Sequence, residues 1–142
     1  MFKLGLVINP VAGVGGSVAL KGSDDMINQA LALGAELKAN ERTKTALRVL
    51  LPYQDSITVY TVNNQMGEQA AKALGFDVKL IYSAQSDITQ ANDTELAVKA
   101  LLAEQVDIIL FAGGDGTARN IAKIVSENAE INKLAQVPVL GI

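Results

Sequence analysis

The sequence has neither cysteine nor histidine in its 142 residues. The absence of cysteine excludes disulfides, thiolate nucleophiles and thiolate metal sites. The absence of histidine removes the commonest base at neutral pH and the commonest zinc ligand. Any chemistry therefore depends on carboxylates, hydroxyls, amides, lysine or a hard cation.

Basic residues are also few, with 12 Lys and Arg against 15 Asp and Glu and a net charge of -3. No cluster of positive charge is present to attract a nucleic acid or an anionic membrane, so neither is expected as a partner. The apolar positions 4–8 are too short to span a bilayer, and no signal-like basic segment precedes them. A cytoplasmic location is the prediction.

What the sequence does contain is a 49% hydrophobic composition, which is enough to bury the core of one domain. Apolar runs rich in Val, Ile and Leu predict strands at 4–8, 57–62, 78–82, 108–112 and 137–142. Their hydrophobicity is continuous rather than alternating, as in strands of a parallel sheet that are covered on both faces.

Helical patterns fill the segments between these runs. We expect a helix over 24–38, a second helical stretch that Pro52 closes, and a third over 66–74 that ends at Gly75. Asn92 and Glu95 have capping-box spacing before a fourth helix, and the stripe of Ile121, Ile124 and Val125 indicates a fifth. The alternation predicts an α/β fold, with a doubly wound, mostly parallel five-stranded sheet, helices on both faces and strand order 3-2-1-4-5.

Glycine is concentrated in two loops that each follow a predicted strand. The first loop contains Asn9, Pro10, Gly13, Gly15 and Gly16. Its backbone N–H groups are able to approach an anion closely, but the loop is not a Walker A sequence. Taken alone, it is equally consistent with a plain turn.

The second loop, Gly113-Gly114-Asp115-Gly116-Thr117, lies between an apolar strand and a helix. Its free N–H groups and the helix dipole suit a phosphate, and the glycines leave space for one. Taken alone, Asp115 is at least as consistent with a helix N-cap. In the predicted strand order both loops lie at the switch point of the sheet, where open α/β sheets bind ligands. This shared position favours an anion-binding site over two plain turns.

These residues carry a resemblance. Gly-Gly-Asp-Gly-Thr after a buried strand, with Asn-Pro and a glycine loop after the first strand, resembles the superfamily of ATP-NAD, diacylglycerol and sphingosine kinases. Residues 111–121 and the loop at 11–20 are most similar to the ATP-NAD kinase branch, which includes AcoX-type members associated with acetoin catabolism. The likeness spans essentially the whole chain.

The resemblance implies that Asp115 lies beside the 2′-hydroxyl of the acceptor ribose and orients or deprotonates it. It implies phosphate contacts for Gly113, Gly114, Gly116 and Thr117, with ATP as donor, NAD as acceptor and Mg²⁺ bridging the nucleotide phosphates without protein metal ligands. Asn9, Pro10, Gly13, Gly15 and Gly16 are the further candidate nucleotide contacts. Asn120 is a candidate from the first helical turn, although a solvated amide is as consistent.

The family's second domain, a β-rich unit with an Asn-Glu or Asn-Asp motif that holds NAD, has no counterpart in residues 1–142. We therefore expect one nucleotide-binding domain that is a domain fragment, without turnover in isolation. The exposed sheet edge of such a fragment also allows self-association into a homo-oligomer.

Two other functions stay open, a diacylglycerol- or sphingosine-type lipid kinase and a non-catalytic AcoX-type nucleotide-binding protein. A dehydrogenase is not expected, because Thr61-Val62-Asn63-Asn64 has no acidic ribose ligand at the end of the second strand. Tyr53, Tyr60 and Tyr82 are expected to pack rather than to stack on a base.

Overall fold

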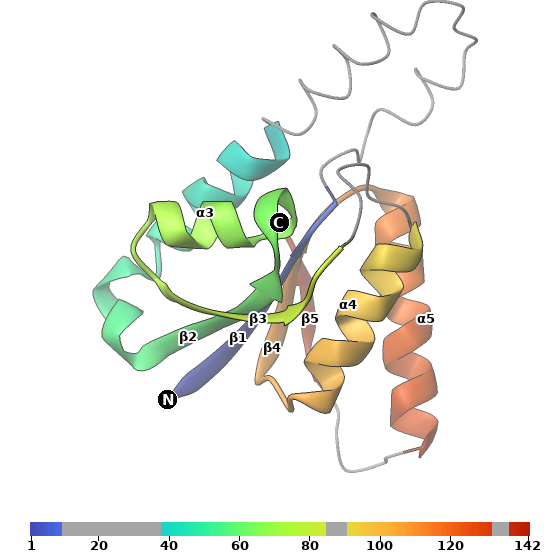
Figure 1. The fold of residues 1–142 in the computed structure, drawn as a ribbon. Helices are drawn as coiled ribbons and strands as arrows, with labels where there is room; N and C mark the ends of the chain where they lie inside the picture. The colour runs from blue at the N-terminus through green and yellow to red at the C-terminus, as the bar shows by residue number, and fades with distance from the viewer. Residues whose placement is uncertain (10–37, 85–90, 132–136) are drawn as a thin grey trace, which may run out of the picture.

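A single parallel sheet forms the centre of the protein. The computed structural model describes residues 1–9, 38–84, 91–131 and 137–142 (Figure 1). The sheet has the order β3-β2-β1-β4-β5 and consists of β1 (Phe2–Ile8), β2 (Ile57–Val62), β3 (Asp77–Tyr82), β4 (Ile108–Ala112) and β5 (Val139–Gly141). The predicted fold class, strand positions and strand order are confirmed.

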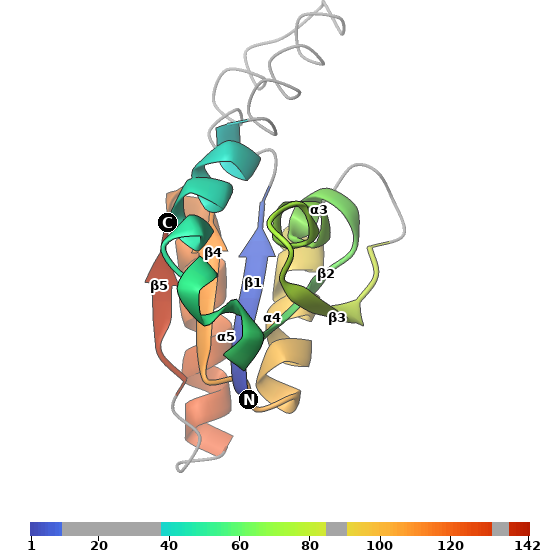
Figure 2. The same cartoon turned by 90° about the vertical axis from the view of Figure 1, so that its left-hand side faces the viewer.

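Helices cover both faces of this sheet (Figures 1 and 2). On one face lie α4 (Ala91–Ala103) and α5 (Asp115–Ile131), which pack against each other. On the other lie the helical residues 38–48 and the short α3 (Glu68–Ala73). Two 3₁₀ helices, η1 (Leu51–Ser56) and η2 (Asn64–Met66), flank β2. None of the helices in these described ranges is long and apolar enough to cross a membrane.

The central strand β1 separates two apolar clusters because its successive side chains point to opposite faces. Leu4, Leu6 and Ile8 pack against residues 38–48 and α3, whereas Val7 packs against α4 and α5. All four side chains are almost fully buried. This two-sided burial accounts for the unbroken hydrophobic runs in the sequence.

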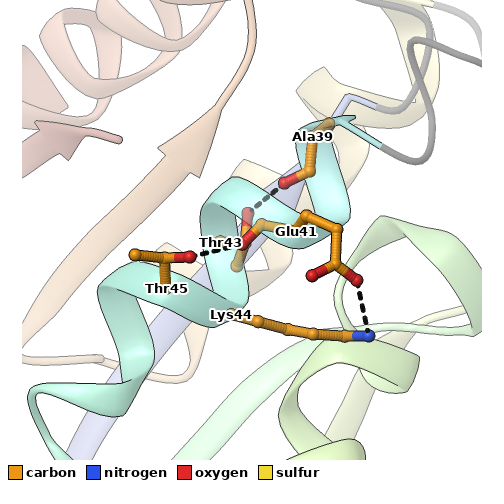
Figure 3. Close-up of polar contacts among 5 residues, drawn as sticks. All are labelled: Ala39, Glu41, Thr43, Lys44 and Thr45. Carbon is orange, nitrogen blue, oxygen red and sulfur yellow. Dashed lines mark hydrogen bonds and ion pairs between the residues drawn. The ribbon is translucent and has the colours of Figure 1, made fainter.

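Residues 38–48 form a helix that contains its own polar contacts (Figure 3). The fully buried Thr43 donates its hydroxyl to the carbonyl of Ala39 at 2.8 Å, and Thr45 donates to that of Glu41 at 3.0 Å. Lys44 pairs with Glu41 at 3.3 Å. The buried threonine therefore satisfies its hydroxyl locally, which allows this face of the helix to lie on the sheet.

Several local predictions need correction. Pro52 does not close the helix at 38–48 directly, because it lies in the first turn of η1, a position where its missing N–H costs nothing. Asn92 is the second residue of α4 and not its cap. Tyr53 is 64% exposed, since η1 buries none of its residues, whereas Tyr60 packs as expected with Lys3 and Lys79 near its ring.

The end of α3 agrees with prediction. Gly75 follows the helix with φ of +87°, the left-handed conformation expected of a C′ glycine, and its N–H donates to the carbonyl of Lys72. At the other end, Glu68 accepts from Lys72 at 2.7 Å and from the Asn64 N–H at 2.9 Å. These hydrogen bonds, that of Lys72 foremost, lower the pKa of Glu68. The predicted helix over 24–38 lies outside the described residues except at its last position.

Candidate functional site

The two predicted loops leave the sheet side by side. β1 and β4 are neighbours in register, with Ile8 opposite Ala112, so Asn9 and Gly113 follow at the same edge. The N–H of Asn9 donates to the carbonyl of Ala112 at 2.8 Å, which extends the pairing by one residue. Of the first loop only Asn9 belongs to the described part of the chain, and Pro10, Gly13, Gly15 and Gly16 lie outside it.

A side-chain hydrogen bond joins the residue after β1 to α5 at this edge. The Asn9 Nδ2 donates to the Thr117 Oγ1 at 2.9 Å, linking residues 108 positions apart in the sequence. Thr117 is the third residue of α5 and is only 5% exposed. Asn9 therefore connects the end of β1 to the first turn of α5.

The glycines of the second loop differ in what surrounds them. A Cβ on Gly113 would lie 2.6 Å from both Cβ and Oγ1 of Thr117 and 2.7 Å from its Cγ2, which is closer than real side chains approach. At Gly116 a Cβ would have no described atom within 4 Å apart from those of its own stretch of helix. Gly113 therefore makes room for Thr117, and the open side of the loop lies at Gly116.

The first turn of α5 lies at this same edge. The carbonyl of Gly114 accepts the hydrogen bond of the Ala118 N–H at 3.0 Å, so Gly114 occupies the N-cap position and Asp115 is the first helical residue. The sequence-based expectation that Asp115 is the N-cap is therefore wrong by one residue, since the cap is Gly114. The N–H groups of residues 115–117 precede the first helical hydrogen bond and point toward the edge, as an anion site requires. The side chain of Asp115 lies outside the described part.

Polar side chains also organise the ends of β2 and β3. Asn63 accepts from the Ala84 N–H at 2.9 Å and donates to the Ala84 carbonyl at 3.3 Å, so its amide pairs with backbone in both directions. Tyr82 donates to Asp93 at 2.8 Å, and this hydrogen bond raises the pKa of Tyr82. The position of a dehydrogenase ribose ligand is therefore taken by an amide that is already engaged with backbone.

A comparison with protein families matches residues 4–142 to the ATP-NAD kinase N-terminal domain. This match covers nearly the whole chain, and the five strands described above lie almost entirely within it. The chain belongs to the ATP-NAD kinase N-terminal domain family. The resemblance inferred from the glycine loops is confirmed at this level. Searches of curated proteins and of solved structures give no match.

Within this ATP-NAD kinase domain, the structure brings together Asn9, Gly113, Gly114, Gly116 and Thr117, at the edge predicted for them. Asn120 lies in the second turn of α5 and is partly buried, so it belongs to the same helix end but not to the hydrogen-bonded contact. Contact of these residues with a ligand stays a prediction.

Two contacts of this edge were not foreseen from the sequence. The two hydrogen bonds between the Asn63 side chain and the Ala84 backbone join residues 21 positions apart. The buried Thr61 donates its hydroxyl to the Leu6 carbonyl at 2.8 Å, 55 positions away. A Cβ on Gly67 would overlap the Thr61 hydroxyl, and Gly67 has φ of +148°. The signal for this pair was a polar residue inside an apolar strand with a glycine shortly after it.

Proposed function

We propose that this chain is the nucleotide-binding part of an NAD kinase, which transfers the γ-phosphoryl group of ATP to the 2′-hydroxyl of the adenosine ribose of NAD. The observation that carries the proposal is the Asn9–Thr117 hydrogen bond, which ties the end of β1 to the first turn of α5 at the switch point of the sheet. Membership of the ATP-NAD kinase family supports the same reaction.

The chemistry follows from the residue types at this edge. In the transfer, the bond between the γ-phosphorus and the bridging oxygen of ATP breaks, and a bond from that phosphorus to the ribose 2′-oxygen forms, so that ADP leaves. The hydroxyl proton passes to a base, and Asp115 is the residue that we assign to that role. Because phosphoryl transfer depends mainly on position and charge, one carboxylate beside the hydroxyl is sufficient base in a chain that lacks histidine.

The loop fits a polyphosphate by its shape and its donors. The open side at Gly116 allows a phosphate to approach the backbone, and the first-turn N–H groups of α5 offer hydrogen bonds. No group of three or more acidic side chains suited to a metal ion is found among the described residues. Mg²⁺ bound to the phosphate oxygens would neutralise their charge, and this chain's part would be to hold the resulting complex.

Ligand binding by the 142-residue chain tests the site. Titration with ATP, ADP and NAD in the presence of Mg²⁺, followed by calorimetry or NMR, is expected to give weak binding of nucleotide. Gly116→Val should weaken it strongly, because the branched side chain would stand in the open space beside the first-turn N–H groups of α5. Failure of a folded wild-type chain to bind any of the three would contradict the assignment of the loops.

Turnover tests the reaction, in the longest form of the protein that contains this chain. NADP formed from NAD and ATP is separated and quantified, with diacylglycerol offered as a competing acceptor. Asp115→Asn is expected to lower the rate at least 100-fold while nucleotide binding persists. Asp55→Asn, an exposed carboxylate in η1, is the matched control and should leave the rate unchanged.

The results separate the proposed kinase from its alternatives. Phosphorylation of the lipid instead of NAD would identify a lipid kinase. Nucleotide binding without turnover of either acceptor, unaffected by Asp115→Asn, would identify a non-catalytic binding protein.

A further inference from the structure

The hydrogen bond between Asn9 and Thr117 has a direction, and that direction limits what each side chain is able to do. The Asn9 Nδ2 carries only donor hydrogens, so the Thr117 Oγ1 is the acceptor at 2.9 Å. A threonine hydroxyl has a single hydrogen, and it must then point away from Asn9 toward another acceptor. The orientation of this hydroxyl is thus set by the amide.

That hydrogen has no acceptor among the described residues. Thr117 is 5% exposed, and its one side-chain hydrogen bond within them is the one it accepts from Asn9. A buried donor without a partner costs about 1–3 kcal/mol, so such groups usually serve a ligand or a bound water. The hydroxyl lies in the first turn of α5, beside the open side of the loop at Gly116.

The Thr117 side chain is also held from its other side. Gly113 lies so close that even a methyl group there would overlap three atoms of Thr117. The threonine is therefore fixed between the Gly113 backbone and the Asn9 amide, and its rotamer has little freedom. A hydroxyl fixed in this way pays little conformational entropy when it binds a ligand.

We propose that Asn9 is a positioning residue, which acts through Thr117 by holding its hydroxyl as a donor toward a phosphate oxygen of the bound nucleotide. Asn9 itself does not contact the ligand in this arrangement. The inference rests on the proposed function, since it takes the ligand to be a nucleoside polyphosphate, and it changes the direct contact predicted for Asn9 into an indirect one.

A double-mutant cycle on the 142-residue chain tests this assignment, with ATP·Mg²⁺ and inorganic triphosphate as ligands and protein NMR as the readout. Asn9→Leu and Thr117→Val should each weaken binding roughly tenfold or more, because a hydrogen bond to a charged group is lost. The double variant should bind about as weakly as Thr117→Val alone. In a Thr117→Ser background, which keeps the hydroxyl, Asn9→Leu should again cost roughly tenfold.

Each other result has a distinct meaning. If the two losses multiply to roughly a hundredfold in the double variant, Asn9 acts independently of the Thr117 hydroxyl, and the inference is overturned while nucleotide binding stands. If the folded wild-type chain binds neither ligand, both the inference and the proposed function fail. Should the valine variant not fold, Thr117→Ala takes its place in the same cycle.

Discussion

Replacing Gly113 by alanine is expected to destabilise the protein strongly, although the change adds only a methyl group. The new Cβ would lie 2.6–2.7 Å from three side-chain atoms of Thr117, where ordinary contacts begin at 3.4 Å. Thr117 is buried and hydrogen-bonded to Asn9, so a shift of its side chain away from the new methyl group would disturb that hydrogen bond. Either the first turn of α5 shifts away from β4 or the Asn9–Thr117 bond breaks.

The magnitude follows from these two effects. Overpacking in a well-packed region costs about 1–3 kcal/mol, and loss of a hydrogen bond costs about 0.5–1.5 kcal/mol. We therefore expect the free energy of unfolding to fall by about 2–4 kcal/mol. For a domain of this size that corresponds to a decrease in Tm of roughly 5–15 °C.

Gly116→Ala is the matched control, since it adds the same methyl group three residues later in the chain, where the new Cβ would meet no described atom outside its own stretch of helix within 4 Å. Its free energy of unfolding should stay within about 0.5 kcal/mol of wild type or rise by up to about 1 kcal/mol, because alanine favours the helix. Urea unfolding of the three proteins measures both effects, provided that the slope m is unchanged. Equal midpoints for the two variants would refute the packing role of Gly113.

Three further outcomes are expected. Thr61→Val should lower the free energy of unfolding by about 1–3 kcal/mol in urea titrations, because the buried hydrogen bond from the Thr61 hydroxyl to the Leu6 carbonyl is lost. The pKa of Glu68 is lowered in the folded protein, so its ionised form stabilises the fold at pH values above the ordinary pKa of a glutamate. This contribution is lost as the pH falls through the lowered pKa. The difference in unfolding free energy between wild type and Glu68→Gln should therefore shrink in acid. In a spectrophotometric pH titration, Tyr82→Phe should remove the tyrosine that ionises above its ordinary range, and an unchanged titration curve would argue against its hydrogen bond.

The sheet was predictable from the sequence because burial on both faces leaves a local trace. Residues 57–62 and 108–112 are predominantly apolar runs, and the strands have the same bounds in the structure. The strand order was predicted as the common order of doubly wound sheets and not from any one residue. Gly75 was predictable for a similar reason, since a helix end that needs positive φ selects glycine.

The contacts of the site were harder to predict from the sequence, because they depend on distances between residues that are far apart in the chain. Both loops were predicted, but nothing near Asn9 in the sequence indicates that its amide binds Thr117, 108 positions away. The three loop glycines look equivalent in the sequence, and only the packing distinguishes Gly113 from Gly116. Asn92 was misplaced because capping-box spacing also occurs within a first helical turn.

The position of Asn9 beside the central strand has a thermodynamic consequence for any ligand that spans the two loops. β1 is paired with β2 on one side and with β4 on the other, and the site exists only while β1 and β4 remain together. An opening that separates these strands destroys both the binding site and the centre of the sheet. Ligand binding would therefore be coupled to cooperative unfolding of the sheet, and it would slow hydrogen exchange at the most protected amides rather than only at the loops.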